Sequence, residues 1–250
     1  MRQRIKILFL AANPGDRTYL KLDREFSAIQ EALRPGKYRD RFQLLNPRFA
    51  ARMENFTSAL ITHKPHIVHF CGHGSANQGI AFEGKGGNSR LAGKQELTTL
   101  FAELNRHARL VFLNACHTRE QAEILGRIFD YTIGTNGLIL DTDAIEFARW
   151  FYRSLADGAT VRGAFLSAQS ALNNRVSKTS VLSKREKADD SKSFVSQVLK
   201  GMRPPAQLSG QIFITTVEDN GKVDNINNVQ VTGGQAHFNS ARSRQSGRKR

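Results

Sequence analysis

The chain has 250 residues, of which 40% are hydrophobic and 24% charged, and it carries a net charge of +15. This length and hydrophobic content suffice for a sizeable core, which excludes an intrinsically disordered chain. The apolar runs are far shorter than the roughly 20 residues that cross a bilayer, and the basic N-terminus lacks the apolar region of a signal peptide. We therefore expect a cytoplasmic protein with no membrane partner.

The first part of the chain alternates between strand-like and helix-like segments. Residues 5–12 predict a buried first strand, and residues 22–33, with apolar side chains at helical spacing, predict a helix. A second strand over 41–46, a helix over 52–63 and a third strand over 67–71 follow. This alternation is typical of a parallel sheet covered by helices.

The pattern continues after a predicted hairpin excursion, formed by the short apolar pieces 79–84 and 89–93. The next predicted elements are a helix over 94–105, a strand over 110–114, a helix over 118–129 with Thr118 as its N-cap, a strand over 131–134 and a helix with an apolar stripe at Ala144, Ala148, Phe151 and Leu155. The sequence therefore predicts an α/β fold with helices on both faces of a mostly parallel sheet.

The composition changes after residue 172. Residues 173–205 begin with many Ser and Lys and few large apolar side chains, so we expect a mobile basic loop there. Residues 210–217 predict a last strand, and residues 218–250 offer too little apolar surface to bury, which predicts a disordered basic tail. The expected organisation is one domain over 1–217 and a tail over 218–250.

Two of the predicted strands end at residues that can form a catalytic pair. His73 follows strand 67–71 and Cys116 follows strand 110–114, and reacting groups gather at the carboxyl ends of parallel strands. If these strands are neighbours, an imidazole and a thiol come within reach of each other. The imidazole can take the thiol proton and return it to a leaving amine, while the backbone amides of Gly74 and Cys116 can bind an oxyanion. The pair therefore predicts acyl transfer by a cysteine nucleophile.

Several blocks also resemble a known family. These are "ILFLAANPGDRTYLKLDREFSAIQEAL", "PHIVHFCGHGS", "VFLNACHT" and "YTIGTNGLILDTDAIEFARWFYRSL". They are similar to CHAT-domain proteins, bacterial caspase-like cysteine proteases of the clan that includes caspases, metacaspases, clostripain and separase. The resemblance implies a caspase-like three-layer sandwich, His73 as base, Cys116 as nucleophile and a polypeptide as substrate. It also implies an effector or cascade role in bacterial defence or programmed death.

Two acidic residues precede or open the helix after residue 140. Asp141 and Asp143 can cap this helix, which is the ordinary role for such residues, Asp143 above all. In the related proteases a carboxylate in the specificity pocket selects a basic residue on the amino side of the cut, and a desolvated Asp paired with a substrate Arg discriminates strongly. We take Asp141 as the better candidate for this pocket, ahead of Asp143.

The expected basic loop suggests a means of activation. No long linker separates Cys116 from Tyr131, where a caspase carries its activation cleavage. An exposed loop can unfold locally into a protease cleft, and Arg175 and Arg185 are the candidate cleavage points. An upstream protease or another copy of the chain would make the cut, and a passive surface insertion is the alternative.

Three other interpretations compete with the protease. A catalytically silent interaction module of the same fold is the main rival. The side chains of Cys71, His73, Cys116 and His117 supply a zinc ligand set, but their spacing is a poor metal signature, and Cys71 is better explained as a buried structural thiol. Nucleic-acid binding would rest on charge alone. We therefore expect neither a metal nor a cofactor, and no nucleic-acid partner.

Overall fold

The computed structural model describes residues 4–49, 51–75, 79–104, 107–173, 180–185 and 188–199. For residues 102–104, 212–215, 231–232 and 235–236 it gives the backbone alone.

A seven-stranded sheet forms the centre of the fold, in the order β10-β9-β8-β7-β3-β1-β2. Its strands are β1 (Ile5–Ala11), β2 (Phe42–Leu44), β3 (Ile67–Cys71), β7 (Leu110–Asn114), β8 (Tyr131–Thr135), β9 (Ser180–Arg185) and β10 (Ile212–Thr215). The pairs β1–β2, β1–β3, β3–β7 and β7–β8 are parallel, and β9 runs antiparallel to both β8 and β10. The sheet is therefore mostly parallel, as predicted.

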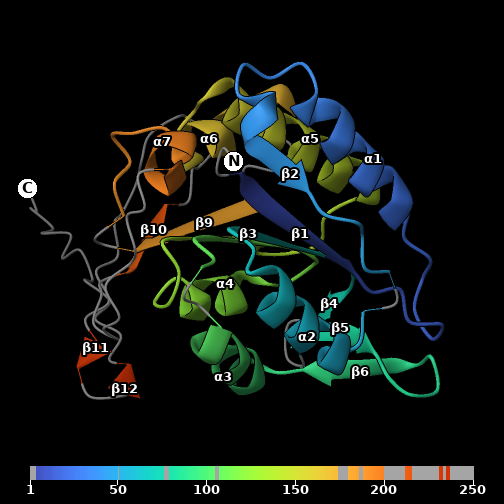
Figure 1. Cartoon of the computed structure of the whole chain (residues 1–250). Coiled ribbons are helices and arrows are strands. Elements are labelled where there is room, and N and C mark those ends of the chain that lie inside the picture. The colour runs from blue at the N-terminus through green and yellow to red at the C-terminus, as the bar shows by residue number, and fades with distance from the viewer. Residues whose placement is uncertain are drawn as a thin grey trace, which may run out of the picture.

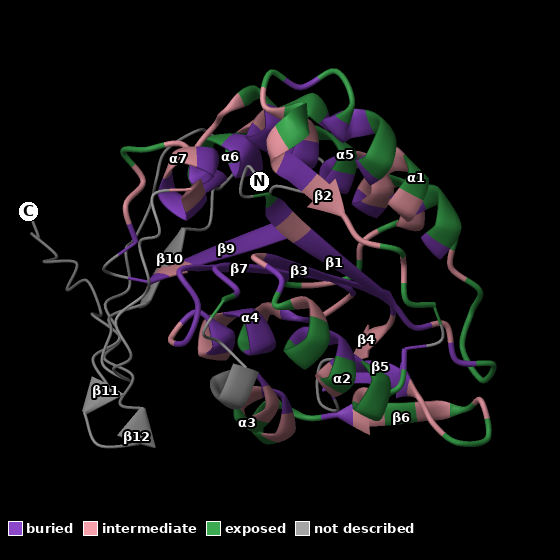
Figure 2. Ribbon diagram, in the orientation of Figure 1, coloured by how far each residue is buried: buried purple, intermediate pink, exposed green. Residues whose placement is uncertain are grey.

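Helices cover both faces of this sheet (Figure 1). On one side lie α1 (Leu22–Leu33), α5 (Asp141–Asp157), α6 (Val161–Ala171) and α7 (Phe194–Leu199), whose apolar residues share one core cluster with β1. On the other lie α2 (Met53–His63), α3 (Lys94–Leu104) and α4 (Arg119–Leu125), which share a second cluster with the opposite face of β1. Figure 2 shows the strands buried between the two helical layers. The predicted three-layer α/β sandwich is confirmed.

A small second sheet extends from the end of β3. The strands β4 (Gly74–Ser75), β5 (Gly79–Glu83) and β6 (Ser89–Ala92) pair antiparallel in that order. The predicted hairpin is therefore confirmed. Its neighbour β4 consists of the two residues that directly follow His73, so the hairpin pairs with the loop that carries His73.

The prediction of a mobile basic loop over 173–205 is wrong for two of its segments. Residues 180–185 form β9 inside the main sheet, and residues 194–199 form α7. The hydrophobic pattern does not reveal β9, because only Val181 and Leu182 of its six residues are apolar, although Ser180, Ser183 and Arg185 are buried as well. Arg185 is 5% exposed, and its backbone N–H donates to the Asp130 carbonyl at 2.9 Å, so this candidate cleavage point does not lie on an exposed loop. Arg175 lies outside the described residues.

Smaller differences concern the element ends. The helix predicted over 118–129 ends at Leu125, and its C-cap residue Gly126 packs against β9: a Cβ on Gly126 would lie 2.9 Å from the Cβ of Ser183. The last strand, predicted over 210–217, is present as β10. Of the predicted tail, the structure describes only the short pair β11 (Val231–Thr232) and β12 (Gln235–Ala236), and the rest lies outside the described residues.

Candidate active site

His73 follows the buried end of β3 and is itself half-buried. Its Nε2 lies 2.8 Å from the carbonyl oxygen of Thr18. A carbonyl can only accept, so Nε2 carries the hydrogen of this bond and, in the neutral ring, Nδ1 is the basic nitrogen. Desolvation lowers the pKa of His73 from its ordinary value, in spite of the Thr18 carbonyl. The imidazole is therefore held as an oriented neutral base.

The segment that supplies Thr18 is residues 13–21, between β1 and α1, and it is tied to other elements at both ends. The Asn13 amide donates to Glu83 Oε1 at 3.2 Å, and the Gly15 amide donates to the Gly87 carbonyl at 2.8 Å, both in the β5–β6 hairpin. At the other end, the Lys21 amide donates to Asp141 Oδ2 at 3.3 Å. These bonds fix the carbonyl that orients His73.

Cys116 lies two residues beyond β7, in the turn that leads to α4, and is half-buried. Its Sγ is 3.9 Å from the carbonyl oxygen of Ile139. The next residue, His117, has a left-handed backbone with φ 54°, and its N–H donates to the Gly137 carbonyl at 3.1 Å. The turn after Cys116 therefore packs against the segment between β8 and α5.

Thr118 stands at the N-cap position of α4, as predicted, but its side chain makes no capping bond. Its hydroxyl is 2.9 Å from the Ala115 carbonyl and accepts from the Thr135 amide at 3.0 Å. The residue thus pins the turn that carries Cys116 to the end of β8.

The structure brings the ends of β3 and β7 together. The strands pair in parallel with Cys71 opposite Asn114, and the Gly72 amide donates to the Asn114 carbonyl at 3.3 Å. Gly74 packs so closely on the backbone of Cys116 that an added Cβ would overlap the Cys116 carbonyl oxygen and lie 3.0 Å from its carbonyl carbon. Only glycine fits at this position, and the loop of His73 therefore rests directly on Cys116.

The two candidate pocket acids lie in the first turn of α5, and both are half-buried. The N-cap is Leu140, so the prediction that Asp143 caps this helix is wrong: the helix begins at Asp141, one turn earlier than a cap at 143 would allow. The charge of Asp141 acts on the pKa values of both His73 and Cys71. Asp141 therefore lies near the segment of Thr18 that orients His73.

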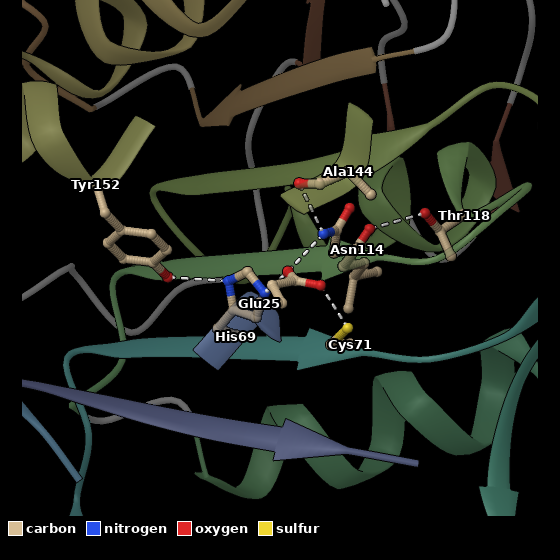
Figure 3. Close-up of polar contacts among 8 residues, drawn as sticks. Glu25, His69, Cys71, Asn114, Thr118, Ala144 and Tyr152 are labelled. Carbon is tan, nitrogen blue, oxygen red and sulfur yellow. Dashed lines mark hydrogen bonds and ion pairs between the residues drawn. The ribbon is translucent and has the colours of Figure 1, made fainter. Parts of the chain in front are cut away.

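Cys71 is buried, as expected, and belongs to a polar cluster in the core (Figure 3). Its thiol donates to Glu25 Oε2 at 2.6 Å, and burial raises the pKa of this thiol well above its ordinary value. A thiol that is buried and donates to a core carboxylate suits the expected structural role of Cys71. Within the described ranges, no three His, Cys, Asp or Glu side chains are grouped to hold a metal ion.

Sequence reasoning missed Thr18 and the cluster around Glu25. Thr18 acts through its backbone carbonyl, which has no side-chain signature. Glu25 did leave a signal, because it interrupts the apolar stripe of α1 between Leu22 and Ile29 and is 1% exposed. A charged residue on the buried face of a helix is a position that must be satisfied inside the core.

Comparisons with known proteins match most of this chain to one domain family. Residues 20–200 match the CHAT domain model. A Gillisia limnaea protein named "Probable protease" is 23% identical over 154 residues, which are 61% of this chain and 27% of the relative. A "Roc-COR-CHAT protease" from an unidentified prokaryotic organism is 23% identical over 176 residues, 68% of this chain and 17% of the relative. The chain thus spans about a quarter or less of the length of these curated relatives.

Among solved structures, the Drosophila initiator caspase Dronc aligns with a TM-score of 0.48 and 10% identity, covering 73% of this chain and 80% of the caspase chain. No helix among the described residues is long and apolar enough to cross a membrane.

The family model matches well over half of the 250 residues, and the chain therefore belongs to the CHAT domain family.

Proposed function

We propose that this chain is a cysteine endopeptidase in which His73 and Cys116 form the catalytic dyad. The observation that carries the proposal is the packing of Gly74 on the Cys116 backbone, which places the loop of an oriented imidazole directly against the loop of the thiol. The two residues follow neighbouring parallel strands, β3 and β7, and lie at the carboxyl ends of these strands, where such sites form.

The proposed reaction begins with transfer of the Cys116 thiol proton to Nδ1 of His73. The thiolate attacks the carbonyl carbon of the scissile peptide bond, and the backbone amides of Gly74 and Cys116 stabilise the oxyanion of the tetrahedral intermediate. The intermediate collapses to a thioester as His73 returns the proton to the leaving amine. Water, deprotonated by His73, then attacks the thioester, releases the new carboxylate and restores the thiol.

We further propose that Asp141 selects a basic residue on the amino side of the cut. Its half-buried carboxylate accepts from the Lys21 amide, in the segment that orients His73, and a substrate Arg or Lys in partly desolvated surroundings would pair with it. Asp143 is the second candidate for the same role. A role in defence or programmed death rests on the family resemblance and stays a prediction. Activation by a cut in the basic loop rests on the expected exposure of that loop, and it stays a prediction for Arg175, which lies outside the described residues.

Cys116→Ala and His73→Ala test the proposal. Each should abolish cleavage of a peptide library, and Cys116→Ala should also abolish covalent labelling by an electrophilic peptide, while circular dichroism stays unchanged. His63→Ala is a matched control, because His63 lies at the end of α2, where its Nε2 contacts Arg48 at 3.3 Å. A wild-type protein that neither cleaves nor becomes labelled would instead support the silent interaction module.

A further inference from the structure

We propose that Glu25 is a positioning residue for the His73–Cys116 pair, which holds in register the segments that carry the site. This inference rests on the proposed function. Glu25 lies in α1, one turn after the segment that supplies Thr18, and is 1% exposed.

Three donors from two neighbouring strands converge on its carboxylate (Figure 3). Nε2 of His69, in β3, lies 2.7 Å from Oε1, and Nδ2 of Asn114, in β7, lies 2.5 Å from the same oxygen. The thiol of Cys71, also in β3, donates to Oε2 at 2.6 Å. A buried carboxylate is stable only when donors of this kind replace water, so the strands and α1 hold one another in place.

These donors stand immediately before the catalytic residues. Cys71 precedes His73 by two positions, and Asn114 precedes Cys116 by two positions. Asn114 Nδ2 also lies 3.3 Å from the Ala144 carbonyl, in the first turn of α5. A single carboxylate therefore joins the two strand ends of the dyad with the helix that opens at Asp141.

The polar cluster around Glu25 extends away from the site through His69, whose ring contacts Tyr152 and two phenylalanines. The Tyr152 hydroxyl lies 3.1 Å from Nδ1 of His69. Burial, followed by the charge of Glu25, raises the pKa of Tyr152 well above its ordinary value, so this hydroxyl keeps its proton and can donate it to the ring. The ring of His69 stacks on Phe9 with centroids 5.2 Å apart, and its centroid lies 4.6 Å from that of Phe112. One of the partners of Glu25, the His69 ring, is thus packed between two aromatic side chains.

A displaced strand end would leave a buried charge without one of its donors, which is costly. The cluster accordingly favours a single arrangement of β3, β7, α1 and α5. Because catalysis depends on sub-ångström placement of base and nucleophile, loss of this selection should lower turnover more than substrate affinity.

Glu25→Gln tests the proposal in the full chain, with Glu31→Gln on the exposed face of the same helix as the matched control. The amide keeps the size of the side chain but turns an NH₂ group toward donors. We expect a kcat roughly 10- to 100-fold lower with KM changed less than about 2-fold, and slower carbamidomethylation of Cys116 by iodoacetamide, read by peptide mass spectrometry. A folded Glu25→Gln protein with wild-type kcat and wild-type alkylation would overturn the proposal.

A second pair of variants covers the case in which Glu25→Gln does not fold. Cys71→Ala removes one donor, whereas Cys71→Ser keeps a hydroxyl that can reach the same oxygen. We expect Cys71→Ala to lower kcat roughly 3- to 10-fold and Cys71→Ser to restore most of the loss. Equal activity in Cys71→Ala and wild type would contradict the proposal.

The alkylation measurement separates this proposal from the proposed function, because iodoacetamide needs no peptide substrate. Should wild type fail to cleave any peptide, the protease assignment fails, and the effect of Glu25→Gln on Cys116 alkylation still decides whether Glu25 positions the thiol.

Discussion

The imidazole of His73 donates a hydrogen bond from Nε2 to the carbonyl oxygen of Thr18, at 2.8 Å. Thr18 lies 55 positions earlier in the chain, so a segment remote in sequence decides which nitrogen of the ring is basic. The same bond limits rotation of the ring about its side-chain torsions.

The state of His73 predicts the acid limb of the pH profile. Desolvation lowers the pKa of His73, so the ring stays neutral and able to accept a proton below the ordinary value of about 6.5. We expect kcat/KM to fall as pH decreases through this lowered pKa, because protonated imidazole cannot take the thiol proton. A profile of kcat/KM from pH 4 to pH 8 measures it, and an acid limb centred above about pH 6.5 would contradict the expectation.

Gly74→Ala should separate the loops of the dyad. The new Cβ would overlap the Cys116 carbonyl, and backbone atoms cannot yield as a flexible side chain can. We expect kcat/KM to fall at least about 10-fold while the protein stays folded. Gly86→Ala is the control, because a Cβ at Gly86 would meet no atom within 4 Å. Equal losses in the two variants would show that the Gly74 contact has no special effect on the site.

Asp141→Asn should reduce the preference for basic residues at the cut. A charge-assisted bond contributes about 1.5–3 kcal/mol, so kcat/KM for an Arg peptide should fall roughly 10- to 100-fold, while an uncharged peptide is cut at nearly the same rate. Asp143→Asn, two positions along the same helix, should change this ratio less. Wild-type cleavage after Asp would contradict the assignment outright, because two carboxylates repel each other out of water.

Leu182→Ala should show that β9 belongs to the core. Leu182 is 6% exposed and lies in the same apolar cluster as α5 and α6. Its truncation should lower the free energy of unfolding by about 2–4 kcal/mol in urea denaturation. The comparison is Leu166→Ala, whose side chain is 40% exposed and should cost far less. A value near zero for Leu182 would restore the mobile-loop interpretation of this segment.

Most of the fold could be predicted from hydrophobic patterns, because the strands nearest the dyad are buried on both faces. The predicted strands 67–71 and 110–114 coincide with β3 and β7 for this reason. In β9 the pattern failed because polar residues are buried there, and one of them is paired inside the fold: Gln169 Nε2 donates to the Ser180 hydroxyl at 2.8 Å. Only the folded chain shows which polar side chains find such partners.

The candidate site could be predicted in part. His73 and Cys116 are visible as reactive residues at strand ends, and their strands do pair as expected. Thr18 could not be found, since any residue type supplies the same carbonyl. Glu25 was readable as a charged residue within an apolar stripe, but its partners lie on β3 and β7 and depend on sheet order.

The polar cluster also bears on when this chain can become active during its synthesis. Glu25 finds its partners 44, 46 and 89 positions later in the chain. Contacts of such sequence separation form late, after the cost of closing long loops has been met. A ribosome-bound chain whose β7 has not yet emerged lacks Asn114 and Cys116 alike, so the nucleophile and the last donor to Glu25 emerge almost together.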